Sequence, residues 1–142
     1  MKATLSPVRA RLAISIAAAG FLLAGCGTSA RDQVKSKVEQ FASAAAHRDY
    51  GTLCSQVLAP SLVAHLKGAG LGCEDAMRIA LAPVRNPALS IGKITVRGSK
   101  ASVIALTLAS GQTASISAIE LVKTSHGWRI ASLGSNLQNA TR

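Results

Sequence analysis

The hydrophobic pattern of the chain changes once, at Pro87, and this change limits the fold more than any other feature. Before Pro87 the apolar residues recur at helical spacing, and after it they follow the pattern of strands. The first part predicts helices at residues 31–48, 52–58, 60–67 and 73–81. The second part predicts strands at residues 89–96, 100–109, 112–123 and 128–133, joined by short turns at 98–99, 110–111 and 125–127. Helices followed by an antiparallel meander define an α+β fold, in which the helices pack on a curved four-stranded sheet.

The first predicted helix should bury a single stripe of apolar side chains against that sheet. This stripe consists of Val34, Val38, Phe41, Ala42 and Ala45. We expect Ser29 to cap this helix, and Asp49 or Thr52 to cap the next. In the helix at 73–81 the spacing predicts an inner face of Met77, Ala80 and Leu81. Ile79 lies off that face, so it should pack against a different neighbour.

An uncharged stretch of 14 residues, Leu12 to Gly25, follows a basic start that contains Lys2, Arg9 and Arg11. A membrane-spanning helix needs about 20 residues, whereas the core of a signal peptide needs about 7–15. The stretch ends in Leu23-Ala24-Gly25-Cys26, which resembles the bacterial lipobox. The resemblance implies cleavage between Gly25 and Cys26 and attachment of diacylglycerol, with palmitate-type chains, to the Cys26 sulfur. Two acyl chains would hold the protein stably on the membrane. An ordinary secretory signal with a chance cysteine, and an uncleaved anchor helix, are the alternatives.

Cys54 and Cys73 remain once Cys26 carries lipid. In an exported protein an even pair of cysteines predicts a disulfide. Two free thiols, or one reactive thiol, are the alternatives. His65 is the sole histidine between the pair, so the sequence offers too few ligands for zinc, and no metal or other cofactor is expected.

The charge and the aromatic content narrow the range of partners. The chain has a formal net charge of +10, and the part after residue 25 has 13 basic and six acidic side chains, which gives +7. This charge could favour contact with anionic headgroups or simply serve solubility. The absence of a Lys/Arg cluster argues against nucleic acid as a partner. The four aromatic residues are too few for a platform that stacks single-stranded bases.

The order of the predicted elements resembles the cone-shaped fold of the nuclear transport factor 2 and SnoaL-like superfamily. The resemblance covers roughly residues 31–134, and it is especially similar to small actinobacterial lipoproteins of that fold. It rests on the element order, on His47-Arg48-Asp49-Tyr50 at the helix end and on Gly127-Trp128-Arg129-Ile130 in the closing strand. The resemblance implies a pocket between helix and sheet, and often homodimers through the open sheet face. A cystatin-like or other α+β roll is the competing fold.

Three residues are candidates for lining that pocket: Tyr50, Glu120 and Trp128. Enzymes of the superfamily use Asp, Tyr and His in the cone, and such catalysis needs a positioned base. Glu120 lies among apolar residues of a strand, and it is a candidate base if its face lines the cone; the pattern favours the outward face. Tyr50 fits packing under the helix end, and Trp128 fits closing the core. No set of catalytic residues can be assembled from the sequence.

The sequence therefore predicts four segments. Residues 1–25 form a signal peptide that is removed, 26–30 a lipidated cysteine and tether, 31–134 the single domain, and 135–142 a polar tail. We expect a lipoprotein anchored on the extracytoplasmic face of the cell membrane. Its expected function is non-enzymatic, namely binding of a small apolar ligand or docking on an envelope protein. The alternative is an isomerase or hydrolyase that uses Glu120 or Tyr50.

Overall fold

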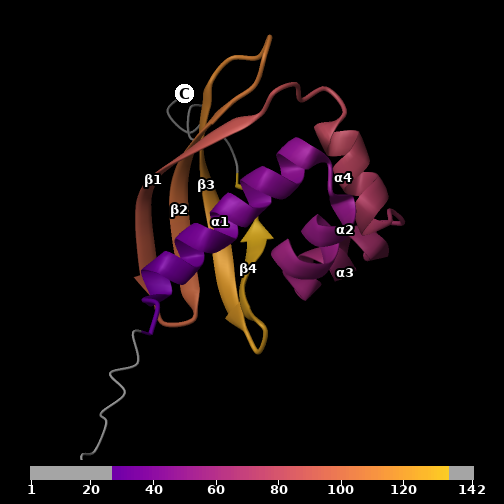
Figure 1. Cartoon of the computed structure of the whole chain (residues 1–142). Helices are drawn as coiled ribbons and strands as arrows, with labels where there is room; N and C mark the ends of the chain where they lie inside the picture. Colours follow the sequence, from indigo (N-terminus) through magenta and orange to yellow (C-terminus); the bar gives the residue numbers. More distant parts are fainter. Residues whose placement is uncertain (1–26, 135–142) are drawn as a thin grey trace, which may run out of the picture.

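The computed structural model of the chain describes residues 27–134. The predicted signal peptide, the lipid-attachment residue Cys26 and the polar tail lie outside the described residues. Helix α1 lies across one face of a curved antiparallel sheet (Figure 1). The shorter helices lie to one side of the sheet, next to β4. The strands follow one another in the order β1-β2-β3-β4. They are β1 (Ala88–Arg97), β2 (Lys100–Leu108), β3 (Ser115–Thr124) and β4 (Gly127–Ser132). The predicted α+β class and the meander of four strands are confirmed.

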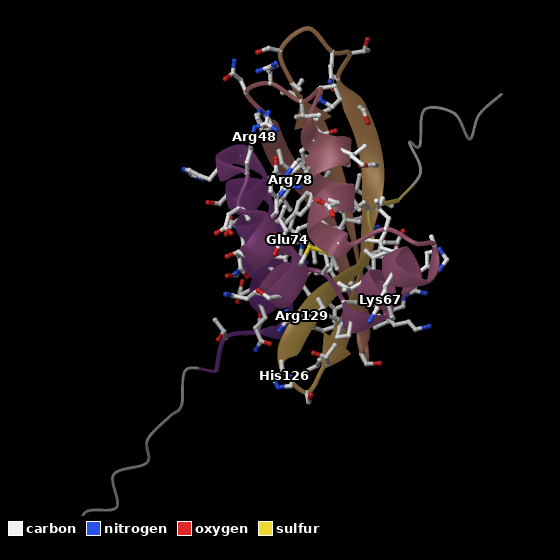
Figure 2. All side chains as sticks on the ribbon, turned by 90° about the vertical axis from the view of Figure 1, so that its right-hand side faces the viewer. Arg48, Lys67, Glu74, Arg78, His126 and Arg129 are labelled. Atoms are coloured by element: carbon white, nitrogen blue, oxygen red, sulfur yellow. A yellow bond between two sulfur atoms is a disulfide. The ribbon has the colours of Figure 1, made fainter. Side chains whose placement is uncertain are left out.

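Helix α1 (Ala30–His47) begins and ends at capping residues. The Ser29 hydroxyl accepts a hydrogen bond from the Asp32 backbone N–H at 3.1 Å, as the sequence predicts. At the other end Arg48 adopts a left-handed conformation with φ of 55°. Its guanidinium donates to the carbonyl oxygens of Leu81 and Val84, both at 3.0 Å. Arg48 therefore ties the end of α1 to a segment more than thirty residues away (Figure 2).

The predicted helix at 52–58 is wrong in both its start and its type. The chain forms α2 (Tyr50–Thr52) and continues directly into the π-helix η1 (Leu53–Val57). The helix starts two residues earlier than predicted because Asp49 caps it: the Asp49 carboxylate accepts a hydrogen bond from the Thr52 N–H at 2.9 Å. The wider π turn ends with a bond from the Leu58 N–H to the Leu53 carbonyl, and it leaves both Leu53 and Leu58 buried. Leu58 then pairs in parallel with Ile130, on the edge of β4.

Helices α3 (Pro60–Gly68) and α4 (Cys73–Leu81) lie close to their predicted bounds, but the inner face of α4 is partly wrong. Ala76 and Met77 are its buried residues, whereas Ala80 is exposed. Ile79 was expected to pack against a different neighbour, but its side chain is 64% exposed. The face is shifted because Cys73 fixes the start of the helix against η1.

The predicted turn at 110–111 forms, and a bond from the Gln112 N–H to the Ala109 carbonyl at 3.1 Å closes it. The predicted start of the next strand is wrong, because β3 begins at Ser115 rather than at Gln112. The longer connection packs against the segment between α4 and β1. The Gln112 side chain donates to the Pro83 carbonyl at 3.1 Å, and the Ser110 N–H donates to the Arg85 carbonyl at 2.8 Å. These bonds take the residues that would otherwise extend the hairpin.

The core lies between α1 and the sheet, and the predicted stripe of α1 faces it in part. Val34, Val38 and Ala45 of that stripe are buried, whereas Phe41 and Ala42 are half-buried. The largest fully buried side chains are Trp128, Leu53, Leu58, Leu121, Ile130, Val34, Val38, Val57 and Val103.

Cys54 and Cys73 form a disulfide, with their Cα atoms 6.0 Å apart, which confirms the predicted pairing. The bond joins η1 to the first residue of α4 across a sequence separation of 19 residues. It fixes two of the shorter helices to each other.

We predict that replacing both cysteines by serine lowers the free energy of unfolding by about 3 kcal/mol, because the unfolded chain gains the entropy of a loop of that length. Urea unfolding of the variant and of the parent protein measures the difference. Parent protein treated with a reductant should lose a similar amount. If the doubly substituted protein were as stable as the parent protein, the disulfide would not constrain the unfolded chain.

Candidate functional site

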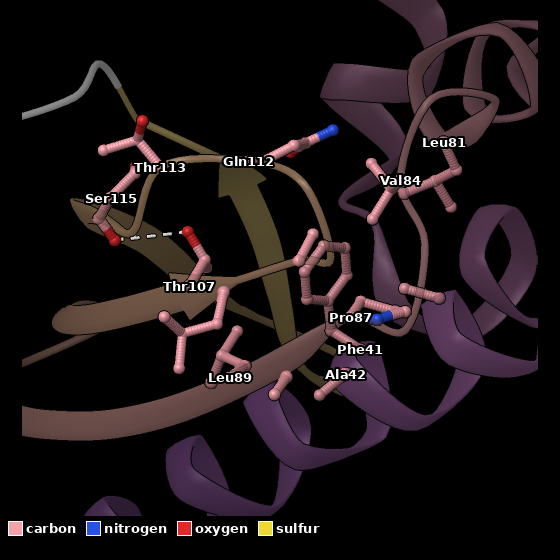
Figure 3. A pocket seen from close by; sticks show the side chains of 14 residues that line it. Phe41, Ala42, Leu81, Val84, Pro87, Leu89, Thr107, Gln112, Thr113 and Ser115 are labelled. Atoms are coloured by element: carbon pink, nitrogen blue, oxygen red, sulfur yellow. Dashed lines mark hydrogen bonds between the residues drawn. The ribbon is translucent and has the colours of Figure 1, made fainter.

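A cleft with a volume of about 380 Å³ opens between the last turns of α1 and the far end of the sheet. Figure 3 shows Phe41 and Ala42 of α1 facing Leu89 of β1, with Val84 and Pro87 closing one side. The remaining wall comes from the end of β2 and the connection to β3. The complete lining is Phe41, Ala42, Ala45, Leu81, Val84, Pro87, Ala88, Leu89, Thr107, Leu108, Ala109, Gln112, Thr113 and Ser115.

The small residues of α1 account for the open space. Ala42 and Ala45 occupy the positions of the apolar stripe that line the cleft, and their methyl groups fill little space. Phe41 was expected in the core but lies half-buried at the wall of the cleft. In the sequence, Phe41 stands beside Ala42 and Ala45 on one face of the helix. This change from a large to a small side chain could have indicated a hollow at that end of α1.

Hydrogen bonds fix the rim of the cleft. Arg48 holds the carbonyl oxygens of Leu81 and Val84, and the Asn86 side chain donates to the Ser110 hydroxyl at 3.1 Å. The segment between α4 and β1 is therefore connected to both α1 and the β2–β3 connection. The cleft is largely pre-formed, as is usual for a small-molecule site.

The polar groups of the lining are few and neutral. The Thr107 hydroxyl donates to the Ser115 carbonyl at 3.2 Å (Figure 3). The Gln112 side chain donates to the Pro83 carbonyl. None of the fourteen lining residues carries a carboxylate, an imidazole, an amine, a thiol or a phenol. The walls therefore offer apolar contact and neutral hydrogen bonds, and they hold no group that titrates.

Glu120 does not belong to the cleft. It is exposed on the outer face of the sheet, where its carboxylate accepts a hydrogen bond from the Ser102 hydroxyl at 2.8 Å. Its neighbours Ile119 and Leu121 point the opposite way and are buried. The alternation of β3 thus places Glu120 outward, as the pattern favoured, and the suggestion that it lines the pocket is wrong.

Tyr50 and Trp128 also lie outside the cleft lining. Tyr50 is half-buried beneath the end of α1, and the Arg78 guanidinium lies 5.4 Å from its ring centroid. The Arg48 Nη1 donates to the Tyr50 hydroxyl at 3.5 Å. Trp128 is 2% exposed in the core, and its Nε1 has no hydrogen-bond partner among the described residues. Both residues are placed by packing, so neither is positioned to act on a molecule in the cleft.

Asp49 precedes Tyr50, and its charge has a structural use. Hydrogen bonds from the backbone N–H and the side chain of Thr52 lower the pKa of its carboxyl, and the nearby His47 acts in the same direction. The carboxylate therefore stays ionised as the cap of α2.

The outer face of the sheet carries apolar side chains without a covering element in the described structure. Leu108 is 43% exposed and Ile116 is 40% exposed. Leu106 lies opposite Ile116 in the pairing of β2 with β3, and Ile104 lies opposite Ala118. The outer apolar strip consists of Ile104, Leu106, Ile116 and Ala118, together with Leu108 at its end, which also lines the cleft.

No helix of residues 27–134 is long and apolar enough to cross a membrane. No group of three or more His, Cys, Asp or Glu side chains in that range could hold a metal ion.

Comparison with solved structures identifies the fold. A protein from the NTF2-like family of Streptomyces avermitilis, provisionally named a dehydratase, has a TM-score of 0.51 at 16% identity and covers 71% of this chain and 90% of its own. An NTF2-like protein of unknown function from Shewanella baltica has a TM-score of 0.51 at 13% identity, covering 71% of this chain and 87% of its own. No family model and no curated protein matches the sequence. The chain therefore has an NTF2-like fold, and likenesses at these identities show the fold alone.

Proposed function

We propose that this protein is an extracytoplasmic lipoprotein that binds a small apolar ligand in the cleft between α1 and the sheet. The observation that carries the proposal is a cleft of about 380 Å³ whose lining contains no titratable side chain. This volume falls in the range of about 300–1,000 Å³ typical of small-molecule sites. Burial of the ligand's apolar surface would supply most of the affinity.

The lining argues for binding rather than catalysis. An isomerase or hydrolyase of this fold needs a base within hydrogen-bond reach of its substrate. Glu120, the candidate base, lies on the outer face of the sheet, and Tyr50 is engaged by two arginines. The enzymatic alternative therefore loses both of the residues on which it depended.

The membrane location is proposed from the sequence around Cys26. Helix α1 begins at Ala30, so a lipid on Cys26 would hold the domain within about 14 Å of the bilayer even if the four intervening steps were fully extended. The disulfide between Cys54 and Cys73 is in keeping with an oxidising, extracytoplasmic compartment.

Docking is the second candidate function, and the outer apolar strip favours it. Exposed leucine and isoleucine side chains in adjacent strands are typical of a surface that meets another protein. A second copy of this chain would cover the strip symmetrically. An envelope protein is the alternative partner.

Substituting Ala42 by tryptophan should fill the cleft and weaken binding of the neutral fluorescent probe N-phenyl-1-naphthylamine by about tenfold or more. Ser43→Trp is the matched control, because Ser43 is exposed on the neighbouring position of α1 and does not line the cleft. Fluorescence titration measures both affinities. Equal binding by the parent protein and Ala42→Trp would show that the probe does not use this cleft.

Substituting Cys26 by alanine should release the protein from the membrane fraction or leave it unprocessed, because the sulfur that carries the lipid is lost. Metabolic labelling with a palmitate analogue, followed by membrane fractionation, measures both effects. A variant that still carried label would overturn the proposed attachment site.

Substituting Ile116 by lysine should convert a dimer to a monomer if a second copy covers the outer apolar strip. Sedimentation velocity of the detergent-solubilised protein measures the mass. A parent protein that sediments as a monomer at all concentrations would leave the strip to a different partner and refute self-association.

A further inference from the structure

A second hollow lies outside the cone, between the π-helix, α3 and the hairpin that joins β3 to β4. Its volume is about 770 Å³. We call it the lateral groove. Figure 2 shows Lys67, His126 and Arg129 around this part of the molecule, away from Arg48 at the end of α1. The lateral groove and the cleft share no lining residue.

The floor of the lateral groove is apolar. Leu58, Pro60, Val63 and Ala64 line it together with the disulfide-bonded Cys54. Pro60, Val63 and Ala64 belong to the same helix, whose backbone groups are already bonded within the helix. Such a wall offers contact to hydrocarbon but few hydrogen bonds to an extended peptide.

The charged groups around the floor are all basic. Lys67 and Arg129 line the lateral groove with His126, and no carboxylate lines it. Among the described residues the ion pairs are Lys35–Glu39 and Arg78–Asp75, so neither Lys67 nor Arg129 has an acidic partner. The positive charge of this groove is therefore not neutralised by the protein.

The guanidinium of Arg129 uses only part of its hydrogen-bonding capacity. Its Nη1 donates to the Ser55 carbonyl at 2.7 Å, whereas its buried Nε has no partner among the described residues. Lys37 donates to the neighbouring Gln56 carbonyl at 3.0 Å. Burial, and to a smaller extent the charge of the nearby Arg129, lowers the pKa of Lys37. An anion beside Arg129 would relieve this repulsion and accept from a guanidinium with donors to spare.

We propose that the lateral groove binds an anionic amphiphile, with its carboxylate or phosphate head at Arg129 and Lys67 and a single acyl chain along the apolar side of α3. The charge of the rim selects the head, and the floor of Leu58, Pro60 and Val63 selects the chain. This site is separate from the cleft and does not depend on the function proposed for the cleft. The amphiphile could be a free fatty acid or an anionic lipid of the bilayer.

The test uses the full chain reconstituted in phosphatidylcholine vesicles and the fluorescent acid 11-(dansylamino)undecanoate. We expect the acid to bind about tenfold more tightly than its methyl ester, because the ester lacks the charge. Lys67→Glu should weaken binding of the acid by about tenfold, whereas Lys93→Glu should change it by less than about twofold. Lys93 is a matched control because it is exposed, lies in β1 away from both hollows and gives the same change of charge.

The proposal would be overturned by equal binding of acid and ester or by equal effects of the two lysine variants. Displacement of the probe by an acidic peptide would also overturn it and would indicate a protein partner. Ala42→Trp should leave binding of the acid unchanged, and a loss in this variant would place the probe in the cleft instead. Competition by free oleate and competition by phosphatidylglycerol in the vesicles distinguish the two sources, and either result supports an anionic amphiphile as the ligand.

Discussion

The packing of α1 across one face of the sheet is the constraint on which the rest of the structure depends. Val34 and Val38 are fully buried on α1, and they join the strand residues Val103, Ile119 and Leu121 in one core. One helix is too narrow to cover a four-stranded sheet along its whole length. The large side chains fill the space at the start of the helix, and the alanines at its end leave the cleft. The same helix therefore supplies both the stability of the domain and the hollow beside it.

Arg48 fixes one wall of the cleft through hydrogen bonds. A non-glycine residue in the left-handed region is uncommon, and here the strain is offset by two hydrogen bonds from its guanidinium to carbonyl oxygens beyond α4. These bonds hold the backbone at Leu81 and Val84, both of which line the cleft. The geometry of the rim is thus determined by polar contacts, while its inner surface remains apolar.

The sequence predicts the fold well because the fold depends on periodicity. The switch from helical to alternating spacing at Pro87, the Ser29 cap and the outward position of Glu120 all follow from local patterns, and the structure agrees with each. One error is local: the Asp49 cap starts α2 two residues before the expected helix, and Asp49 is one of the two caps expected from the sequence. Two other differences accompany contacts between distant residues, because Gln112 is bonded to Pro83 ahead of β3 and the π turn places Leu58 beside Ile130. Such contacts produce no periodic pattern in the sequence.

The cleft and the lateral groove also differ in how far the sequence could predict them. The cleft involves Phe41, Ala42 and Ala45, which the sequence places on one face of a helix, so the position of one wall could have been inferred. The lateral groove brings together Lys67, His126 and Arg129 from three separate elements. Their proximity is a result of the tertiary fold, so no pattern along the chain indicates that these three residues meet.

The pairing of Leu58 with Ile130 has a consequence for how these domains can be crowded together. It covers part of the free edge of β4, where the Ala59 N–H also donates to the Ile130 carbonyl at 2.7 Å. The opposite edge, β1, is interrupted by an irregularity between Ile91 and Ile94 that contains the exposed Lys93. A covered edge and a kinked, charged edge are poor templates for an incoming strand. Many copies concentrated on one surface would therefore resist joining edge to edge into continuous sheets.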